Sequence, residues 1–261
     1  MNPNDNVQRF TELIIPTGWN PPPKVFVLAR HEVHVWRANL DLTPARLQSL
    51  YQILAPDEQA RAGRFRFQKD RDNYTAARGL LRTILGRYLD MEPAQLSFGY
   101  GPYGKPGLLA GLGRSGLNFN MAHSHRMAIY GLTYNRCIGV DLERIQTDFD
   151  CEQIAARFFT PQESATLRAL PPALRHEAFF NGWTRKEAYI KARGEGLAFP
   201  LDQFEISLTP GEPARLFHVG GDVVEANRWS LQALKPDPAY AAALVVEGRD
   251  WQLKCWHWSE P

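Results

Sequence analysis

The spacing of apolar residues predicts that this chain folds into both helices and strands. Between residues 70 and 89 apolar side chains recur every three or four positions, the period of an amphipathic helix; they are Ala76, Ala77, Leu80, Leu81, Ile84 and Leu85. Further helices are predicted at 44–54, from 56 onward, at 152–159, at 161–169 and from 172 to 193. Thr43 and Thr160 each precede a proline and are expected to cap the helix that follows.

Shorter runs of β-branched and aromatic residues, bounded by glycine and proline, predict strands. In the first part of the chain they lie at 25–29, 32–39, 96–100, 117–120, 127–134 and 137–143. Five more follow at 204–208, 214–218, 229–234, 240–246 and 251–258. We expect these last five to form an antiparallel sheet, and the whole pattern predicts an α+β fold.

The chain also shows a weak internal repeat. Tyr74-Thr75, a helix and a strand near Phe98 are echoed by Trp183-Thr184, a helix and a strand near Phe204. The echo suggests two similar α+β halves, residues 25–135 and 136–261, that meet along a cleft. Residues 1–24 are rich in proline and show little periodicity, so they are expected to form an extended lead-in.

Composition narrows the class of protein. With 261 residues and 44% hydrophobic content, the chain can build one elaborate domain or two of ordinary size. A formal net charge of +2 argues against a nucleic-acid partner but leaves room for a local basic site. The scattered Cys137, Cys151 and Cys255 suggest neither a disulfide framework nor a zinc site. No apolar run is long enough to span a bilayer, so we expect a soluble, cytoplasmic protein without a membrane partner.

The segment from Trp183 to Lys191 is predicted to be a helix on which Trp183, Glu187 and Lys191 share one face. Taken alone, Glu187 and Lys191 could be a surface ion pair that contributes ~0.2–0.5 kcal/mol. Phe179 and Phe180 extend the same face with apolar side chains, which would place the pair at the edge of a core. A charge at such an edge needs a partner.

Strand 137–143 offers that partner. Asp141 and Glu143 are two residues apart, so they point to the same side of the strand. They are either solvated acids on an edge strand or ligands of a hard cation, since Mg²⁺ takes carboxylate and phosphate oxygens. With Glu187 as a third carboxylate, Lys191 would lie one turn away, where it could meet an anion that the metal holds.

Basic residues gather between Asp57 and Arg82, where seven lysines and arginines are set against four acids. They form either a solvated face or a site for a phosphate-bearing ligand. Arg61 and Arg64 share a helix face, while Arg78 lies among apolar residues, where a guanidinium needs an anion.

Two predicted loops hold further candidates. Lys105 lies in the glycine- and proline-rich loop 101–107 and is either an ordinary turn lysine or a ligand-binding group held in place. His123 is expected in the short loop 121–126 between two apolar strands, which would fix the direction of its imidazole. Glu163 already has a structural explanation, because it occupies the capping-box position after Thr160.

Five segments stand out in this order: Tyr103-Gly-Lys-Pro106, Phe119-Asn-Met-Ala-His-Ser124, Gly139-Val-Asp-Leu-Glu143, Arg157-Phe-Phe159 and Trp183-Thr-Arg-Lys-Glu-Ala-Tyr-Ile-Lys191. Together they resemble the Sfp-type 4′-phosphopantetheinyl transferases, over residues 55 to 208. The resemblance implies two pseudo-symmetric α+β halves in one monomeric chain, with coenzyme A and Mg²⁺ bound in the cleft between them. It also implies transfer of phosphopantetheine to a serine of an acyl or peptidyl carrier protein, with release of adenosine 3′,5′-bisphosphate.

The same resemblance assigns roles to the catalytic candidates. Asp141, Glu143 and Glu187 match the metal ligands of the family, and Glu187 is also the candidate general base. Lys191 and His123 match groups that contact the pyrophosphate and stabilise the charge that develops there.

The remaining candidates match residues that bind coenzyme A. Lys105 corresponds to the loop lysine near the coenzyme, and Arg61, Arg64 and Arg78 fall where basic residues meet its 3′-phosphate.

Two positions depart from the family pattern, and two other functions stay open. A serine commonly precedes the family's histidine, but here it is Ala122, and His125 stands where a glycine often follows. A metal-dependent phosphoesterase or nuclease would also use clustered acids and a lysine. A noncatalytic coenzyme A binding module would use the basic residues alone.

Overall fold

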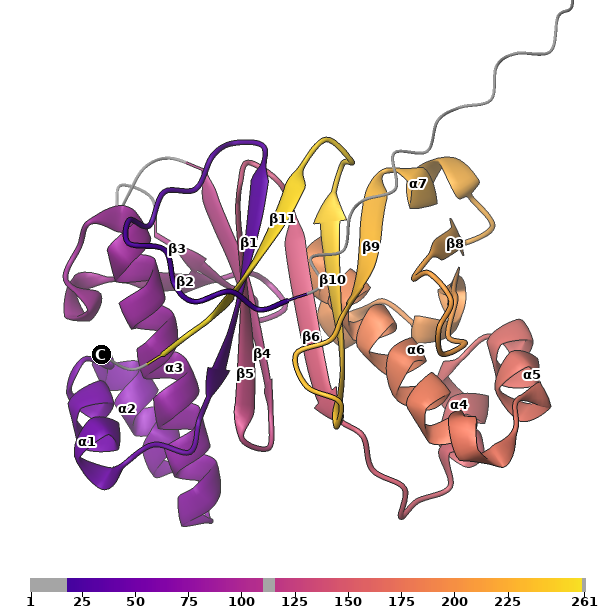
Figure 1. Ribbon diagram of the computed structural model, residues 1–261, viewed down its shortest axis with the longest axis horizontal. Coiled ribbons are helices and arrows are strands. Elements are labelled where there is room, and N and C mark those ends of the chain that lie inside the picture. Colours follow the sequence, from indigo (N-terminus) through magenta and orange to yellow (C-terminus); the bar gives the residue numbers. More distant parts are fainter. Residues whose placement is uncertain (1–17, 110–115, 260–261) are drawn as a thin grey trace, which may run out of the picture.

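The two halves of the chain repeat one order of elements, as Figure 1 shows. The computed structural model describes residues 18–109 and 116–259. The first half contains β1 (Glu32–Asn39), α1 (Pro44–Gln52), α2 (Pro56–Gly63), α3 (Gln68–Leu89), η1 (Pro93–Gln95), β2 (Phe98–Tyr100), β3 (Pro106–Leu108), β4 (Leu117–Ser124) and β5 (Met127–Tyr134). The second contains β6 (Ile138–Arg144), α4 (Cys151–Phe158), α5 (Pro161–Ala169), α6 (Pro172–Arg193), η2 (Gly196–Ala198), η3 (Leu201–Gln203), β7 (Phe204–Ile206), β8 (Leu216–Val219), α7 (Val223–Asn227), β9 (Trp229–Leu234), β10 (Tyr240–Glu247) and β11 (Gln252–His257).

The sheets repeat as well. Strands β1, β5 and β4 lie in that order in one sheet, and β6, β10 and β9 take the same order in the other. Neighbouring strands within each of these triplets are antiparallel. A short hairpin, β2–β3 or β7–β8, follows each of the long helices α3 and α6. The α+β fold with two pseudo-symmetric halves that the sequence predicted is therefore confirmed.

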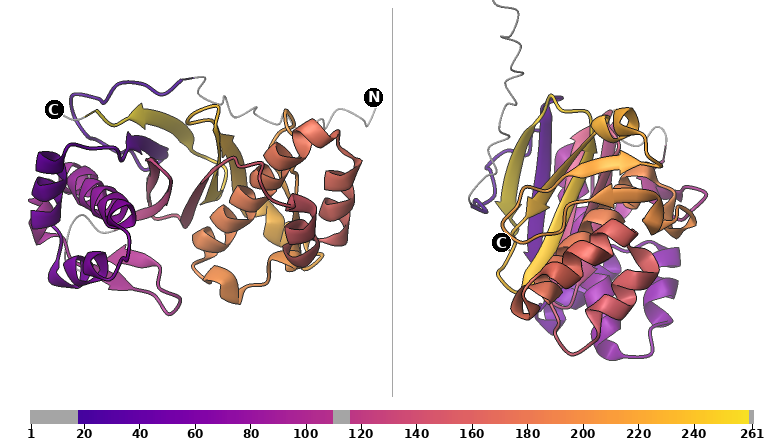
Figure 2. Two further views of the ribbon diagram at one scale, coloured as in Figure 1. Left: turned by 90° about the horizontal axis from the view of Figure 1, so that it is seen from below. Right: turned by 90° about the vertical axis from the view of Figure 1, so that its right-hand side faces the viewer.

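Apolar side chains fill three cores, which explains the layered arrangement. One core joins α3 to the first sheet, a second joins α6 to the other sheet, and the third lies between the two sheets. Successive side chains of a strand point to opposite faces, so Leu244 of β10 lies in the core between the sheets while Val245 packs toward α6. The helices consequently lie at the two outer sides of the molecule, with the strands between them (Figures 1 and 2).

The two sheets meet where β4 runs beside β6. The backbone N–H of Val140 donates to Asn120 Oδ1 at 2.9 Å, so the first half binds directly to the second. This contact brings the end of β4 next to the carboxylate-bearing face of β6. It places residues from both halves around one site.

The final strand does not follow the prediction. Residues 252–257 form β11, which pairs in parallel with β1 in the first sheet, instead of joining an antiparallel sheet of the last five strands. Strands β7 and β8 also form a separate hairpin. The division of the chain between residues 135 and 136 stays a prediction.

The predicted strand at 25–29 is also wrong. These residues form no strand, and Val25 and Val27 are 70% and 65% exposed. Their apolar, β-branched side chains produced the pattern of a strand, but no strand within residues 18–109 and 116–259 pairs with them. Residues 1–17 of the predicted lead-in lie outside the described residues.

Most predicted helices are confirmed with small changes at their ends. Thr43 and Thr160 cap α1 and α5 as expected, and Thr160 forms a capping box with Glu163. Throughout the described ranges, no helix is both long enough and apolar enough to cross a membrane.

Candidate active site between α6 and β6

Strand β6 and helix α6 approach each other very closely. A Cβ atom at Gly139 would lie 2.0 Å from the carbonyl oxygen of Ala188 and 2.4 Å from the amide nitrogen of Ala192, so only glycine fits. Alternate residues of a strand share a face, and Asp141 and Glu143 therefore lie on the same side as Gly139, toward α6. Their apolar neighbours on β6 fill the core between the sheets.

The acids of β6 make specific contacts with both halves. Lys191 Nζ donates to Asp141 Oδ1 at 2.6 Å, which joins α6 to β6. Asp141 is only 4% exposed, and its Oδ2 atom is buried without a hydrogen-bond partner. Ser124 Oγ, at the end of β4, donates to Glu143 Oε2 at 2.8 Å. The sequence analysis did not identify Ser124, because nothing in its local pattern indicates a contact with β6.

Glu187 is the third acid of the site. Burial raises its pKa to about 7, and the negative charges of Asp141 and Glu143 act in the same direction. Burial and the charge of Asp141 likewise raise the pKa of Glu143. Burial lowers the pKa of Lys191, but the three carboxylates outweigh it, so this pKa is raised overall. The four groups therefore form one electrostatically coupled cluster, which we call the acid–lysine cluster.

The side chains of the acid–lysine cluster are suited to binding a magnesium ion, although they do not form a preformed site. Within the described residues, no three His, Cys, Asp or Glu side chains gather tightly enough to mark a preformed metal site. The oxygen donors are of the kind that Mg²⁺ prefers. The unpartnered Asp141 Oδ2 fits a group that a cation would complete, and so does the pKa of Glu187, which burial and the nearby carboxylates raise. The metal-ligand roles of Asp141, Glu143 and Glu187 stay predictions.

His123 lies on strand β4 and not in a loop, because β4 continues to Ser124 and the turn is formed by the two residues that follow. Taken as a whole residue, His123 is exposed. Desolvation lowers the pKa of His123, and the positive charges of Lys191 and Arg61 lower it further. His123 is therefore near a cation from each half, and its imidazole is predominantly neutral at pH 7.

The basic candidates fall into two groups. Arg61 and Arg64 are exposed, and the guanidinium of Arg61 lies 5.6 Å from the centre of the Tyr74 ring. Arg78 is only 5% exposed and forms a short ion pair with the buried Glu58. The same carboxylate also pairs with Arg82, so it offsets only one of the two guanidinium charges. Whether Arg78 also binds a ligand stays a prediction.

Lys105 reaches from the β2–β3 loop to the second half. Its Nζ donates to the carbonyl oxygens of Ile138 at 2.9 Å and Ala192 at 3.3 Å, and burial lowers its pKa to about 8. A cavity of about 420 Å³ lies beside it, with Tyr100 and Phe119 among the lining residues. Lys105 therefore connects the loop to the end of α6 and borders a space that could hold part of a ligand.

The two departures from the family pattern occupy distinct environments. Ala122 is 6% exposed and packs in the core between the sheets. His125 forms the β4–β5 turn with a φ of 55°, a left-handed conformation in which glycine would be favoured.

Comparisons with known proteins agree with this architecture. Residues 137–245 match the family model described as the 4′-phosphopantetheinyl transferase superfamily. Residues 39–131 match the model described as 4′-phosphopantetheinyl transferase, N-terminal. The first of these matches includes all four residues of the acid–lysine cluster.

Individual relatives carry the same description. The 4′-phosphopantetheinyl transferase HetI of Nostoc sp. is 46% identical over 240 residues, which is 92% of this chain and 98% of that protein. The 4′-phosphopantetheinyl transferase Sfp of Bacillus subtilis is 30% identical over 156 residues, covering 60% of this chain and 67% of that protein. The L-aminoadipate-semialdehyde dehydrogenase-phosphopantetheinyl transferase of Homo sapiens is 25% identical over 224 residues, covering 79% of this chain and 72% of that protein. This chain belongs to the 4′-phosphopantetheinyl transferase superfamily.

Proposed function

We propose that this protein transfers 4′-phosphopantetheine from coenzyme A to a serine of an apo acyl or peptidyl carrier protein. The observation that carries the proposal is the acid–lysine cluster, formed between α6 and β6 in a chain of this family. Adenosine 3′,5′-bisphosphate would leave as the second product. Neither a phosphoesterase nor a simple coenzyme A binding module accounts for the family membership together with this cluster.

In the proposed reaction the serine oxygen of the carrier forms a bond to the pantetheine-bearing phosphorus, and the bond from that phosphorus to the leaving phosphate oxygen breaks. Glu187 would accept the serine proton, directly or through water, because its carboxylate belongs to the acid–lysine cluster and a carboxylate can act as a general base. Lys191 would stabilise charge on the leaving group, with His123 as a hydrogen-bond donor. When bound by Asp141, Glu143 and Glu187, Mg²⁺ would neutralise the pyrophosphate.

Coenzyme A would lie across the two halves. The exposed guanidinium groups of Arg61 and Arg64 would bind its 3′-phosphate. Lys105 and the cavity beside it would border another part of the molecule. Arg78 is buried and its guanidinium is held by Glu58, so it would meet a phosphate only at an inner edge of the site.

We propose further that one chain is sufficient for activity, with the first half at 25–135 and the second at 136–261. Residues of both halves contribute to the site, as the bond from Ser124 to Glu143 illustrates. A monomeric cytoplasmic enzyme would fit this arrangement. Light scattering coupled to size-exclusion chromatography would test the monomer, because an obligate dimer would elute at twice the chain mass.

The experiment that tests the function is intact-mass measurement of several apo carrier proteins after incubation with this protein, coenzyme A and Mg²⁺. The expected result is a gain of the phosphopantetheine mass, lost when EDTA replaces Mg²⁺ and absent from a carrier whose modified serine is replaced by alanine. Release of inorganic phosphate without a mass gain would support a phosphoesterase instead. A thermal shift with coenzyme A but no mass gain on any carrier would support a binding module.

A further inference from the structure

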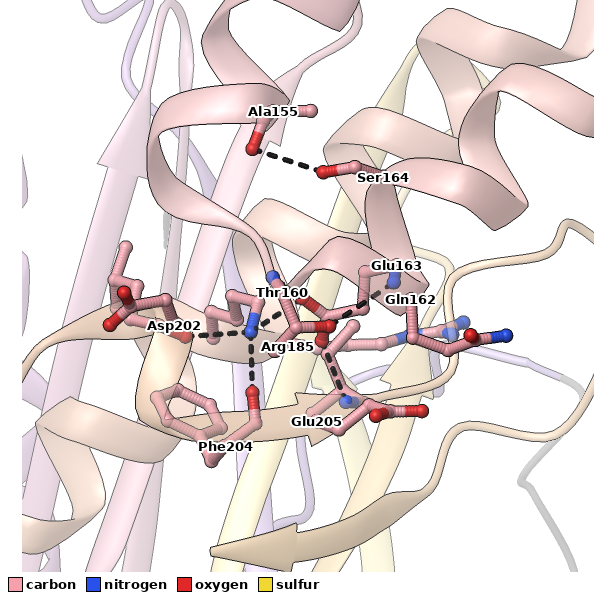
Figure 3. Close-up of polar contacts among 12 residues, drawn as sticks. Ala155, Thr160, Gln162, Glu163, Ser164, Arg185, Asp202, Phe204 and Glu205 are labelled. Atoms are coloured by element: carbon pink, nitrogen blue, oxygen red, sulfur yellow. Dashed lines mark hydrogen bonds and ion pairs between the residues drawn. The ribbon is translucent and has the colours of Figure 1, made fainter. Parts of the chain in front are cut away.

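A buried ion pair joins α6 to α5 next to the acid–lysine cluster in the sequence, and Figure 3 shows the polar contacts around Glu163. Lys186, the residue before Glu187, is completely buried, and its Nζ lies 2.8 Å from Glu163 Oε2 of α5. The same ammonium donates to the carbonyl oxygens of Leu201 and Phe204, each at 2.8 Å. All three hydrogens of the Lys186 ammonium are thus used, and we call this arrangement the α6 clasp.

Glu163 joins the clasp to two further segments. Its Oε2 accepts from the backbone N–H of Thr160 and its Oε1 from that of Ile206, both at 2.8 Å. Through Glu163 and Lys186, helix α6 is connected to the start of α5, to η3 and to β7. Four separate segments therefore depend on one pair of side chains.

The first half contains an equivalent clasp. Glu58 of α2 accepts from the backbone N–H of Ala55 at 2.9 Å and pairs with Arg82 of α3 at 2.6 Å. Arg82 also donates to the carbonyl oxygens of Pro93 and Leu96. Pro93 begins η1 and Leu96 follows it, just as Leu201 begins η3 and Phe204 follows it. The recurrence indicates that the fold uses this device to set a long helix against the segments around it.

Net stabilisation does not explain the α6 clasp well. Glu163 and Lys186 are 2% and 0% exposed, so both charges are removed from water. Desolvation of a buried ion pair can offset its Coulomb attraction, and an apolar pair of similar volume is often as stable. Unlike an apolar pair, however, the charged pair holds its partners in a defined geometry through directed hydrogen bonds.

We propose that Lys186 and Glu163 are positioning residues that fix the rotation of α6 about its axis, so that Glu187 and Lys191 face β6. This inference rests on the proposed function of Glu187 and Lys191. Successive helix residues are turned by ~100°, so an anchored Lys186 determines the direction of Glu187. On the β6 side, Gly139 lets the helix backbone approach directly and sets its distance.

The site tolerates only a small rotation of α6. With a side-chain radius of ~5–6 Å, a rotation of α6 by about 20° would move the Glu187 carboxylate by roughly 2 Å. Catalytic groups must be held within ~0.5 Å of their working positions. A modest loosening of the clasp would therefore separate Glu187 from Asp141 while leaving the helix folded.

The test compares Lys186→Met with the matched control Arg82→Met, which removes the equivalent clasp cation of the first half. Thermal unfolding by circular dichroism checks that both variants are folded at the assay temperature. Binding of Mn²⁺, a cation that also takes carboxylate ligands, is then measured with coenzyme A present, from the electron paramagnetic resonance signal of the free ion. Turnover on an apo carrier is measured at saturating carrier and coenzyme A.

Both variants should show a lowered Tm, but only Lys186→Met should bind Mn²⁺ at least ~10-fold more weakly and turn over ~10–100-fold more slowly. Its affinity for coenzyme A without metal should stay within about twofold, because no clasp residue is a predicted coenzyme ligand. Mn²⁺ affinity and turnover equal to those of an active parent would overturn the inference and make the clasp purely structural. If Lys186→Met does not fold, Glu163→Gln takes its place, and Mn²⁺ binding and turnover are measured in the same way. This variant retains an amide oxygen that can accept from the backbone N–H groups. An inactive parent would instead overturn the proposed function, and this inference with it.

Discussion

At the scale of single residues, the protonation of Glu187 links stability to function. Its pKa of about 7 in the folded protein lies above the ordinary value of 4.5. The folded state therefore binds the proton more tightly than the unfolded chain does. The stability that this group contributes is present below about pH 4.5 and is lost as the pH rises through about 7.

We predict that, in EDTA, the parent loses stability relative to Glu187→Gln between about pH 5 and about pH 7.5, by at most ~3 kcal/mol. The reason is that ionised Glu187 is buried and lies near Asp141 and Glu143, whereas the amide stays neutral. Urea denaturation of both proteins at the two pH values measures the difference. A difference in unfolding free energy that does not change with pH would show that Glu187 titrates normally.

Arg61 tests the predicted site for the 3′-phosphate of coenzyme A. Arg61→Ala should weaken coenzyme A but not dephospho-coenzyme A, since a charged hydrogen bond worth ~1.5–3 kcal/mol exists only with the former. Isothermal titration with both ligands measures this, and Arg168→Ala, an exposed arginine on α5, is the matched control. Equal losses for the two ligands would place the 3′-phosphate elsewhere.

The sequence identified most of the charged residues of the site, but it did not identify the residues that they contact. Two carboxylates on one strand face follow from the period of a strand, so Asp141 and Glu143 could be found locally. The ion pair between Arg78 and Glu58 could not, because it joins α2 to α3 through the tertiary fold. Lys105 was found as a constrained loop lysine, but its contacts at the end of α6 depend on how the two halves meet.

At the scale of elements, the close packing of α6 on β6 is the feature that brings Lys191 to Asp141. Gly139→Ala should force the two elements apart, since the added Cβ would overlap the Ala188 carbonyl oxygen. We predict a loss of ~1–3 kcal/mol in unfolding free energy and a fall in turnover of ~10–100-fold.

Urea denaturation and turnover measure the effect of Gly139→Ala, and Gly63→Ala is the control. Gly63 lies in α2 with nothing within 4 Å of an added Cβ, so its substitution should be neutral or slightly stabilising. An equal response of the two variants would mean that α6 can shift without consequence for the site.

Helices were easier to predict than strands because their signals are local. Pro44 after Thr43, and Pro161 after Thr160, mark helix starts that the structure confirms. The segment 25–29 has strand-like composition but no partner, and pairing with a neighbour is what makes an extended segment a strand. His123 was assigned to a loop because polar residues at the end of β4 hid the continuation of the strand.

At the scale of the whole molecule, β11 closes the fold by returning to the first half. It lies in parallel beside β1, a pairing between segments more than two hundred positions apart that no local pattern indicates. The sequence repeat did predict two halves, but it matched the wrong pair of positions. It matched Tyr74 with Trp183, although Tyr74 lies nearer the start of its helix than Trp183 does. The structure instead matches Arg82 with Lys186, which form equivalent clasps.

The two cysteines Cys255 and Cys137 test this closure. Cys255 of β11 is 4% exposed in the core between the sheets, and Cys137 is exposed. Cys255→Ser should lower the unfolding free energy by ~1–3 kcal/mol, because it buries a hydroxyl among apolar groups. Cys137→Ser should change it by less than ~0.5 kcal/mol. Equal values from chemical denaturation would contradict the packing of β11 against the core.

The central claim is that the acid–lysine cluster performs phosphopantetheine transfer, and Glu187→Gln tests it most directly. The substitution keeps the size of the side chain but removes its charge and basicity. The measurement is the rate at which an apo carrier protein gains the phosphopantetheine mass, for parent and variant, with Mg²⁺, coenzyme A and carrier all saturating. We predict complete conversion by the parent and a rate at least ~10²-fold lower for the variant. No mass gain with the parent, or rates within a few-fold of each other, would contradict the account.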